Sequence, residues 1–426
     1  MASIEDLYSS IANDSAAQSG TQAGLALRAG DLASAAPTVP PDCSNAQLQE
    51  FFHAHPERDT VAVVADGAPL GLVNRNHFME QYGKPFSREL FGKASCLSFA
   101  DAAPLITPFE TPIEVLVRHA VAPNSRVMKD GFICTRDGQY CGTGSGMTLL
   151  KAMSDIEAEK TRQLLSSIDY ASAIQQSNMR ASMSELQQGL PDSRLVWLPR
   201  DVVGGDCYFF RATRDGMFGA IIDCTGHGVP GAFMTLIALS FLESRIAGGD
   251  EAPGPARILG ELNRHIKKVL GQDATAKDGI QAAMKSDDGL DAFMFVLSRD
   301  RRTLSYAGAR LEMAIAVPGE DEVRLLEGDK MGVGYSDTPD DFAYTTSTVV
   351  LPPDSRVLVT TDGIIDQIGG PKNIAHGRKR LYRLLAQRRT LAPADLAAVL
   401  LEQFAEWQGE QRRRDDVCFL TFAAGA

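Results

Sequence analysis

The sequence of 426 residues predicts an α+β protein of several domains, whose largest part is an α+β sandwich. At roughly 150 residues per domain, this length is too great for one small module. From about residue 195 onward, short strands separated by Gly and Asp turns are gathered together and the helices come in separate blocks, which favours a sandwich over a repeating βαβ ladder. Residues 151 to 190 contain no proline and no glycine until Gly189, which predicts one long helix before that sandwich.

The composition excludes several classes of protein. With 44% apolar and 23% charged residues, the chain is neither fibrous nor disordered throughout. Lys and Arg number 42 against 54 Asp and Glu, and this net charge of −12 argues against a nucleic-acid or anionic membrane partner. The seven cysteines form no C-x-x-C pair, and neither an export signal nor an apolar run near 20 residues is present. We therefore expect a cytoplasmic protein with no membrane segment.

Residues 1–33 are dominated by Ala, Ser, Gly and Gln. Such a segment buries too little apolar surface to offset the conformational entropy lost on ordering. The sequence therefore predicts a disordered tail over residues 1–33.

Residues 34–150 contain a weak internal repeat. In each copy an apolar strand meets an Asp-Gly turn, a second strand follows, and a helix-compatible segment closes the unit. The turns are Asp66-Gly67 and Asp137-Gly138, which lie 71 residues apart. This pattern resembles a pair of CBS motifs, and the resemblance implies a regulatory α/β tandem that binds an adenine nucleotide between its repeats. The alternative is a packing or dimerisation module without a ligand.

The predicted helix of residues 151–190 carries an apolar stripe that includes Leu164, Ile168, Met179 and Leu186. A lone helix of this length with such a stripe is not stable in water. Two arrangements would bury the apolar stripe: pairing of the helix with a second copy in a homodimer, and packing of the helix back on the same chain. Pro191 ends the helix in either case.

Aspartates beside glycines mark the strand ends of the last domain. They are Asp206, Asp223, Asp362 and the pair Asp415-Asp416. If these carboxylates converge, each pair 4 Å apart repels by about 4 kcal/mol at an effective dielectric constant of 20. A metal ion makes such convergence reasonable, and oxygen ligands without His or Cys side chains select Mg²⁺ or Mn²⁺.

Five motifs, in order along residues 195–426, resemble those of the PPM phosphatases of the SpoIIE type. The motifs are Val203-Gly204-Gly205-Asp206, Asp223-Cys224-Thr225-Gly226-His227-Gly228, Gly289-Leu290-Asp291, Thr361-Asp362-Gly363 and Asp415-Asp416. The resemblance implies an αββα sandwich over residues 191–426 with two or three metal ions between its sheets. It also implies removal of phosphate from phosphoserine or phosphothreonine on a small regulatory protein, such as an anti-sigma-factor antagonist.

The resemblance also assigns site residues. Asp223 bridges two metal ions, Asp206 and the Cys224 carbonyl serve the second ion, Asp362 and Asp415 hold the first, and Asp291 contributes to a third. Asp416 is an alternative to Asp415, and Asp287 and Asp288 are alternatives to Asp291. His227 either protonates the leaving hydroxyl or caps the following helix. The motifs place no arginine securely on the substrate phosphate.

The ligand set is intact, which favours an active metal-dependent serine/threonine phosphatase regulated through its N-terminal module. The competing hypothesis is a pseudophosphatase or scaffold that binds a phosphoprotein without turnover. Hydrolysis of small phosphate esters such as nucleotides is a third possibility that the motifs do not exclude.

Overall fold

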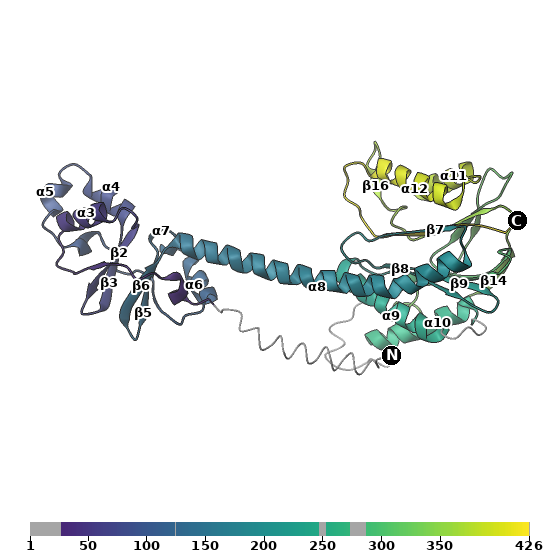
Figure 1. Ribbon diagram of the computed structural model, residues 1–426, viewed down its shortest axis with the longest axis horizontal. Helices are drawn as coiled ribbons and strands as arrows, with labels where there is room; N and C mark the ends of the chain where they lie inside the picture. Colours follow the sequence, from purple (N-terminus) through teal and green to yellow (C-terminus); the bar gives the residue numbers. More distant parts are fainter. Residues whose placement is uncertain (1–26, 124, 247–252, 273–286, 426) are drawn as a thin grey trace. The chain divides into compact units, whose positions relative to one another are not determined.

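The computed structural model describes residues 27–123, 125–246, 253–272 and 287–425. The chain divides into two compact units, one up to Gln163 and one from Leu164 onward. One helix, α8 (Gly146–Gly189), belongs to both units (Figure 1). Each unit is described by itself.

The first unit consists of two copies of one strand arrangement. In each copy a short strand pairs in parallel with the next, which turns back into an antiparallel partner. The first copy contains β1 (Thr38–Val39), α3 (Asn45–Ala54), β2 (Thr60–Ala65), β3 (Ala68–Asn74) and α4 (Arg75–Tyr82). The second contains β4 (Ile106–Pro108), α6 (Ile113–Ala120), β5 (Phe132–Arg136), β6 (Gln139–Gly144) and the start of α8. Short helices α2 (Ala29–Leu32), α5 (Ser87–Phe91), η1 (Cys96–Phe99) and α7 (Val127–Asp130) complete the unit.

The repeat predicted from the two Asp-Gly turns is confirmed. Asp66 and Asp137 have φ angles of +50° and +52°, and the glycines that follow have +80° and +78°. Aspartate tolerates the left-handed region and glycine adopts it freely, so both turns suit their hairpins. The turns connect β2 to β3 and β5 to β6. Membership of the CBS family stays a prediction.

The predicted disordered tail is wrong for residues 27–33, while residues 1–26 lie outside the described part of the chain. The main-chain N–H of Ala29 donates to the Thr111 carbonyl at 2.8 Å, and both Ala29 and Gly30 are buried. A Cβ on Gly30 would lie 2.1 Å from the Phe109 ring. The small residues that suggested disorder therefore permit close packing of α2 against the second repeat.

Helix α8 starts five residues earlier than predicted and ends at Gly189. Its first turn is fixed by Ser145, whose hydroxyl accepts the main-chain N–H of Thr148 at 3.1 Å. Towards its C-terminus, Met179 and Leu186 are buried in the core of the second unit. That part of the stripe packs back on its own chain, because the helix lies against the domain it leads into. Leu164 remains 66% exposed.

The second unit has two antiparallel five-stranded sheets. The first has the order β14-β11-β10-β9-β8 and the second β13-β12-β15-β18-β7. The strands of the first sheet are β8 (Asp206–Ala212), β9 (Gly216–Cys224), β10 (Leu290–Ser298), β11 (Thr303–Ala309) and β14 (Ser347–Val350). Those of the second are β7 (Ser193–Leu198), β12 (Met313–Ala316), β13 (Arg324–Leu326), β15 (Arg356–Thr360) and β18 (Val417–Ala423). A hairpin of β16 (Ile368–Gly369) and β17 (Ile374–Ala375) lies apart from them.

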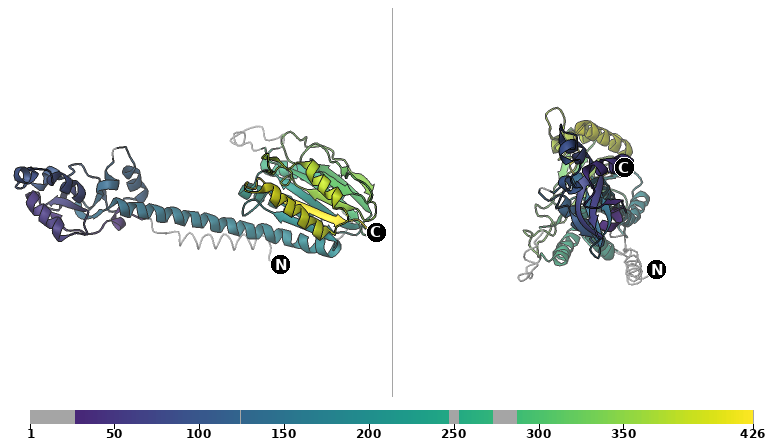
Figure 2. Two further views of the ribbon diagram at one scale, coloured as in Figure 1. Left: turned by 90° about the horizontal axis from the view of Figure 1, so that it is seen from above. Right: turned by 90° about the vertical axis from the view of Figure 1, so that its left-hand side faces the viewer.

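Helices cover the outer face of each sheet, which gives the αββα order. Helices α9 (Gly228–Ile246) and α10 (Pro255–Leu270) pack on the first sheet, and α11 (Arg378–Gln387) and α12 (Pro393–Gln408) on the second (Figures 1 and 2). Alternation along β18 shows the layering: Leu420 lies in the core between the sheets and Phe419 in the core beneath α11 and α12. The predicted α+β sandwich is present.

Helix α9 is long and apolar enough by composition to cross a membrane, but half of it is buried in the domain. It packs on β8 and β9, and Ala238 and Leu242 are fully buried. Its apolar character is therefore explained by the core beneath it.

Candidate active site

Three aspartates lie side by side at one end of the first sheet. Asp206 on β8 pairs in register with Asp223 on β9, and Asp223 pairs in register with Asp291 on β10. Residues directly opposite each other on antiparallel strands project from the same face of the sheet. The three carboxylates therefore form a row, although they are separated by up to 85 positions in sequence.

The second sheet brings two further carboxylates to this end. Asp362 follows β15 and Asp415 precedes β18, and these strands are neighbours. Thr361 accepts a hydrogen bond from the Cys418 N–H at 3.0 Å, and its hydroxyl donates to Asp206 Oδ2 at 2.7 Å. The bond from Thr361 to Asp206 connects the two sheets, so Thr361 holds the row of carboxylates on the first sheet beside Asp362 and Asp415 of the second sheet.

The carboxylates are in unfavourable electrostatic surroundings. Burial, reinforced by repulsion from Asp223, raises the pKa of Asp206 well above its usual value. Burial and the charges of Asp362, Asp415 and Asp291 do the same to the pKa of Asp223. Burial followed by repulsion from Asp415 raises the pKa of Asp362 to about 6, and burial raises that of Asp291 to about 6. A cation among these groups would relieve this strain.

The residues fit a hard divalent cation. All the converging side-chain donors are carboxylate oxygens, and Asp291 Oδ1 is buried without a hydrogen-bond partner among the described residues. In the part of the chain that the structure describes, no three such side chains are close enough to form a finished coordination sphere. The carboxylates nevertheless raise one another's pKa values, and side chains adjust when an ion binds.

Cys224 offers its main chain and not its thiol. The thiol is buried beside Cys207, and burial raises its pKa well above the usual value. A Cβ at Gly205 would lie 2.8 Å from the Cys224 carbonyl oxygen and 2.3 Å from the Gly226 carbonyl oxygen. Glycine at position 205 thus leaves the Cys224 carbonyl uncovered on that side.

Asp416 differs from Asp415 in its partners. Asp416 Oδ1 accepts the Arg200 N–H at 2.5 Å, and Oδ2 accepts the Gly205 N–H at 2.6 Å. Asp415 Oδ1 accepts only the N–H of Asp416, at 2.9 Å, among the described contacts. Both oxygens of Asp416 are therefore engaged in holding the segment before β8.

Asp287 and Asp288 lie before β10 and outside the row of paired aspartates. Asp287 Oδ1 accepts the Ser336 N–H at 2.8 Å, and this bond lowers its pKa. Asp288 is connected through its main chain to Gln272. Asp291 alone of these three is in register with Asp223.

His227 lies immediately before α9, and its side chain is 47% exposed. Its Nδ1 is 3.0 Å from Asp201 Oδ2. This contact orients the ring, and it leaves the choice between proton donor and helix cap open.

Two arginines lie near the carboxylates at places that the sequence did not predict. The Arg310 Nη1 lies 3.7 Å from Asp291 Oδ1, and its guanidinium lies over the Tyr335 ring, 4.5 Å from the ring centroid. Arg378, at the start of α11, offsets part of the rise in the pKa of Asp362 that burial and the neighbouring carboxylates cause. Neither arginine lies in one of the five motifs; the basic run Arg378-Lys379-Arg380 after the Asp362 motif is visible in the sequence, but it does not indicate a contact with the site.

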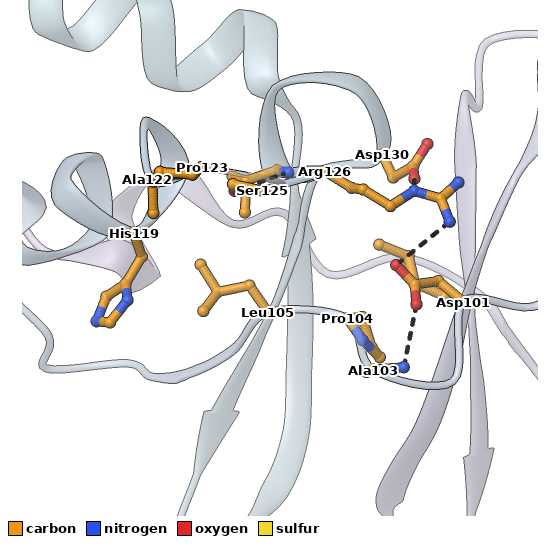
Figure 3. Close-up of a pocket in the computed structure, with 13 residues that line it drawn as sticks. Asp101, Ala103, Pro104, Leu105, His119, Ala122, Pro123, Ser125, Arg126 and Asp130 are labelled. Carbon is orange, nitrogen blue, oxygen red and sulfur yellow. Dashed lines mark hydrogen bonds and ion pairs between the residues drawn. The ribbon is translucent and has the colours of Figure 1, made fainter.

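The first unit contains a separate hollow of about 470 Å³ (Figure 3). Leu72 comes from the first repeat, residues 101–105 of the lining come from the segment between the repeats, and the rest comes from the second repeat. Arg126 Nε is 2.7 Å from Asp130, and its Nη1 is 3.9 Å from Asp101. Asp130 is 3% exposed, and its Oδ1 has no hydrogen-bond partner among the described residues. The hollow thus combines buried charge with room for a small molecule.

Comparison with known proteins gives consistent relatives for the second unit. Residues 213–424 match the family SpoIIE, Stage II sporulation protein E. The phosphoserine phosphatase RsbP of Bacillus subtilis (strain 168) is 24% identical over 219 residues, which are 51% of this chain and 48% of RsbP. The chain therefore spans about half the length of this curated relative. The SiaA-PP2C domain of Pseudomonas aeruginosa is 33% identical, with a TM-score of 0.53, over 62% of this chain and 99% of that domain.

Proposed function

Because the chain belongs to the SpoIIE-type PP2C phosphatases, we propose that it is a metal-dependent protein serine/threonine phosphatase acting on a small regulatory phosphoprotein. The single observation that carries this proposal is the register of Asp206, Asp223 and Asp291, which face Asp362 and Asp415 from the other sheet. Bringing these carboxylates together without a cation costs free energy, because each is desolvated and their charges repel one another.

The proposed metal ligands follow from the site. They are the carboxylates of Asp206, Asp223, Asp291, Asp362 and Asp415 and the carbonyl of Cys224, for two or three Mg²⁺ or Mn²⁺ ions. When bound, these ions neutralise the phosphoryl oxygens and activate water for attack on phosphorus. Asp415 is preferred to Asp416 because both oxygens of Asp416 already accept main-chain N–H groups.

Other residues orient the site. The Thr361 hydroxyl fixes one oxygen of Asp206, and Asp416 fixes the main chain at Gly205 immediately before it. His227, held at Nδ1 by Asp201, is proposed to donate a proton from Nε2 to the departing serine oxygen. Arg310 and Arg378 balance part of the negative charge around Asp291 and Asp362.

The test compares wild type with Asp223→Asn and a matched control, Asp215→Asn, in the exposed turn between β8 and β9. Hydrolysis of p-nitrophenyl phosphate and of a phosphoserine peptide is measured with Mn²⁺ and with EDTA. Wild type and the control should turn over only with Mn²⁺, and Asp223→Asn should lose at least a hundredfold in kcat while remaining folded. A folded Asp223→Asn protein with full activity would contradict the proposed site.

Two alternatives are distinguished in the same experiment. A pseudophosphatase or scaffold would bind the phosphoserine peptide but release no phosphate under any metal condition. A small-molecule phosphatase would hydrolyse nucleotides far faster than the peptide. The name of RsbP, a phosphoserine phosphatase, supports a phosphoserine group as the substrate of this chain.

Regulation through the first unit is part of the proposal. Its hollow is proposed to bind an adenine nucleotide, with Arg126 as the cationic contact, in a cytoplasmic homodimer that pairs through the exposed part of α8. The alternative, a packing module without a ligand, predicts no binding. Calorimetric titration of the full chain with ATP and AMP, compared with Arg126→Ala, decides between the two.

A further inference from the structure

A second hollow, of about 450 Å³, lies beside the candidate active site. It is lined by Arg200, Asp201, Gln408, Arg412 and Arg413. The first two residues belong to the segment between β7 and β8, and the others to the end of α12 and the segment before β18. Arg200 donates its N–H to Asp416, and Asp201 contacts His227, so one wall of the hollow adjoins the site.

The hollow is cationic in an acidic chain. The protein carries a net charge of −12, yet three guanidinium groups line this hollow against one carboxylate, Asp201, which is already bonded to His227. None of the ion pairs found among the described residues involves Arg200, Arg412 or Arg413. The local positive charge is therefore left for an external anion.

Two of these arginines are fixed through main-chain acceptors. Arg200 Nη1 donates to the Arg414 carbonyl at 3.0 Å, and Arg413 Nη2 donates to the Pro199 carbonyl. Arg413 Nε is buried and has no partner among the described residues. Main-chain acceptors thus hold both guanidinium groups at the hollow without neutralising their charge.

The segment that carries Arg412 and Arg413 is fixed by a buried amide. Gln367 is fully buried; its Nε2 donates to the Arg412 carbonyl at 3.1 Å, and its Oε1 accepts the Arg414 N–H at 3.1 Å. Its own carbonyl accepts the Trp407 indole N–H at 3.1 Å. A segment held at both ends loses little backbone entropy when it binds a partner.

The hollow is separate from the cations that act on the metal-binding carboxylates. Arg310 and Arg378 are the arginines whose charges offset part of the rise in the pKa values of Asp291 and Asp362, and neither lines the hollow. None of the five candidate metal-site carboxylates lines the hollow either, so an anion bound there lies beside the candidate metal site and not within it.

We infer that Arg200, Arg412 and Arg413 bind an acidic side chain of the substrate protein close to its phosphoserine. Guanidinium groups match carboxylates in planar, two-bond geometry, which makes arginine well suited to this recognition. The inference rests on the proposed function and specifies its substrate as a phosphoprotein with Asp or Glu flanking the phosphorylated residue.

The test uses the full chain with Mn²⁺ and three probes. Two phosphoserine peptides are identical except for Glu or Gln at the flanking positions, and p-nitrophenyl phosphate has no flanking group. The variants are Arg412→Ala, Arg412→Lys and a control, Arg264→Ala, at an exposed position of α10 on the opposite outer layer. Arg412 is exposed, so its truncation should leave the fold intact.

Wild type should show about a fivefold higher kcat/KM for the Glu peptide, since exposed charge pairs contribute up to about 1 kcal/mol each. Arg412→Ala should remove most of that preference through KM, Arg412→Lys should keep part of it, and Arg264→Ala should keep all of it. Hydrolysis of p-nitrophenyl phosphate should change less than twofold in every variant. High salt should reduce the preference for the Glu peptide in wild type.

Equal kcat/KM for both peptides in wild type would overturn the inference. A loss in Arg412→Ala as large on p-nitrophenyl phosphate as on the Glu peptide would also overturn it, because the hollow would then act on the scissile group. If wild type hydrolyses none of the probes, the proposed function has failed. Fluorescence anisotropy then measures peptide binding directly, and equal affinity for the two peptides would refute the acidic-residue site.

Discussion

A buried glutamine of α8 holds the segment that leads into Asp206. Gln175 is 1% exposed, and its Nε2 donates to the Gly204 carbonyl at 2.7 Å and to the Thr235 hydroxyl at 2.9 Å. Its Oε1 accepts the Gly204 N–H at 3.3 Å. The Gln175→Leu variant keeps a similar volume but leaves both main-chain groups of Gly204 without this partner.

The expected loss of stability is about 2–4 kcal/mol. A buried polar group left without a partner costs about 1–3 kcal/mol. We use the lower half of that range for two groups because the 3.3 Å bond is weak and Thr235 keeps its bond to the Ala232 carbonyl. Since Gly204 lies two residues before Asp206, the kcat of the folded variant should also fall.

Urea unfolding and Mn²⁺-dependent hydrolysis are measured on Gln175→Leu and on Gln176→Leu. Gln176 is the adjacent exposed glutamine of the same helix, and its replacement should change the unfolding free energy by less than about 0.5 kcal/mol. If the unfolding free energy of Gln175→Leu lies within about 0.5 kcal/mol of the wild-type value, the hydrogen bonds of Gln175 contribute less to stability than we expect. If stability falls but kcat does not, Gln175 supports the fold without positioning Asp206.

Four further outcomes are expected. Mn²⁺ at a hundredfold excess over Kd should stabilise the EDTA-treated protein by about 2.7 kcal/mol in thermal unfolding, and Asp362→Asn should diminish that gain. In the folded state the pKa values of Asp291 and Asp362 are raised to about 6, above their unfolded values near 4. Protonation of these two carboxyl groups therefore stabilises the folded state, fully below about pH 4, and the stabilisation is lost as pH rises through 6. Without metal the melting temperature should fall between pH 4 and 7, and Asp291→Asn should reduce the fall. Asp416→Ala should cost at least about 2 kcal/mol in urea unfolding because two N–H groups lose their acceptor, whereas Asp415→Ala should mainly lower kcat. Ile168→Asn should lower the oligomeric mass in sedimentation if α8 pairs with a second copy, and an unchanged mass would exclude that pairing.

Local chemistry in the sequence determined much of the architecture. The Asp-Gly turns predicted the two repeats of the first unit because the left-handed backbone is accessible to few residues. The stretch free of proline and glycine predicted α8, and aspartates at the ends of apolar strands predicted Asp206 at the start of β8 and Asp223 near the end of β9. These signals depend on neighbours within a few residues, so they can be recognised without knowing the fold.

Tertiary structure alone decided the contacts between distant segments. Asp415 and Asp416 are adjacent in sequence, and only the approach of Arg200 and Gly205, more than 200 positions away, gives Asp416 two main-chain donors. Arg310 reaches Asp291 only because of the packing around β10 and β11.

The segment that contains Ala29 and Gly30 shows that tertiary contacts also order residues whose composition predicts disorder. Ala29 and Gly30 have the composition of a disordered segment, but the surface formed near Phe109 buries them. Composition measures what a segment can bury by itself, whereas the stability of α2 comes from a surface built by residues about 80 positions further along the chain. Such pairings depend on which strands and helices become neighbours, and this information is absent from any short window of sequence.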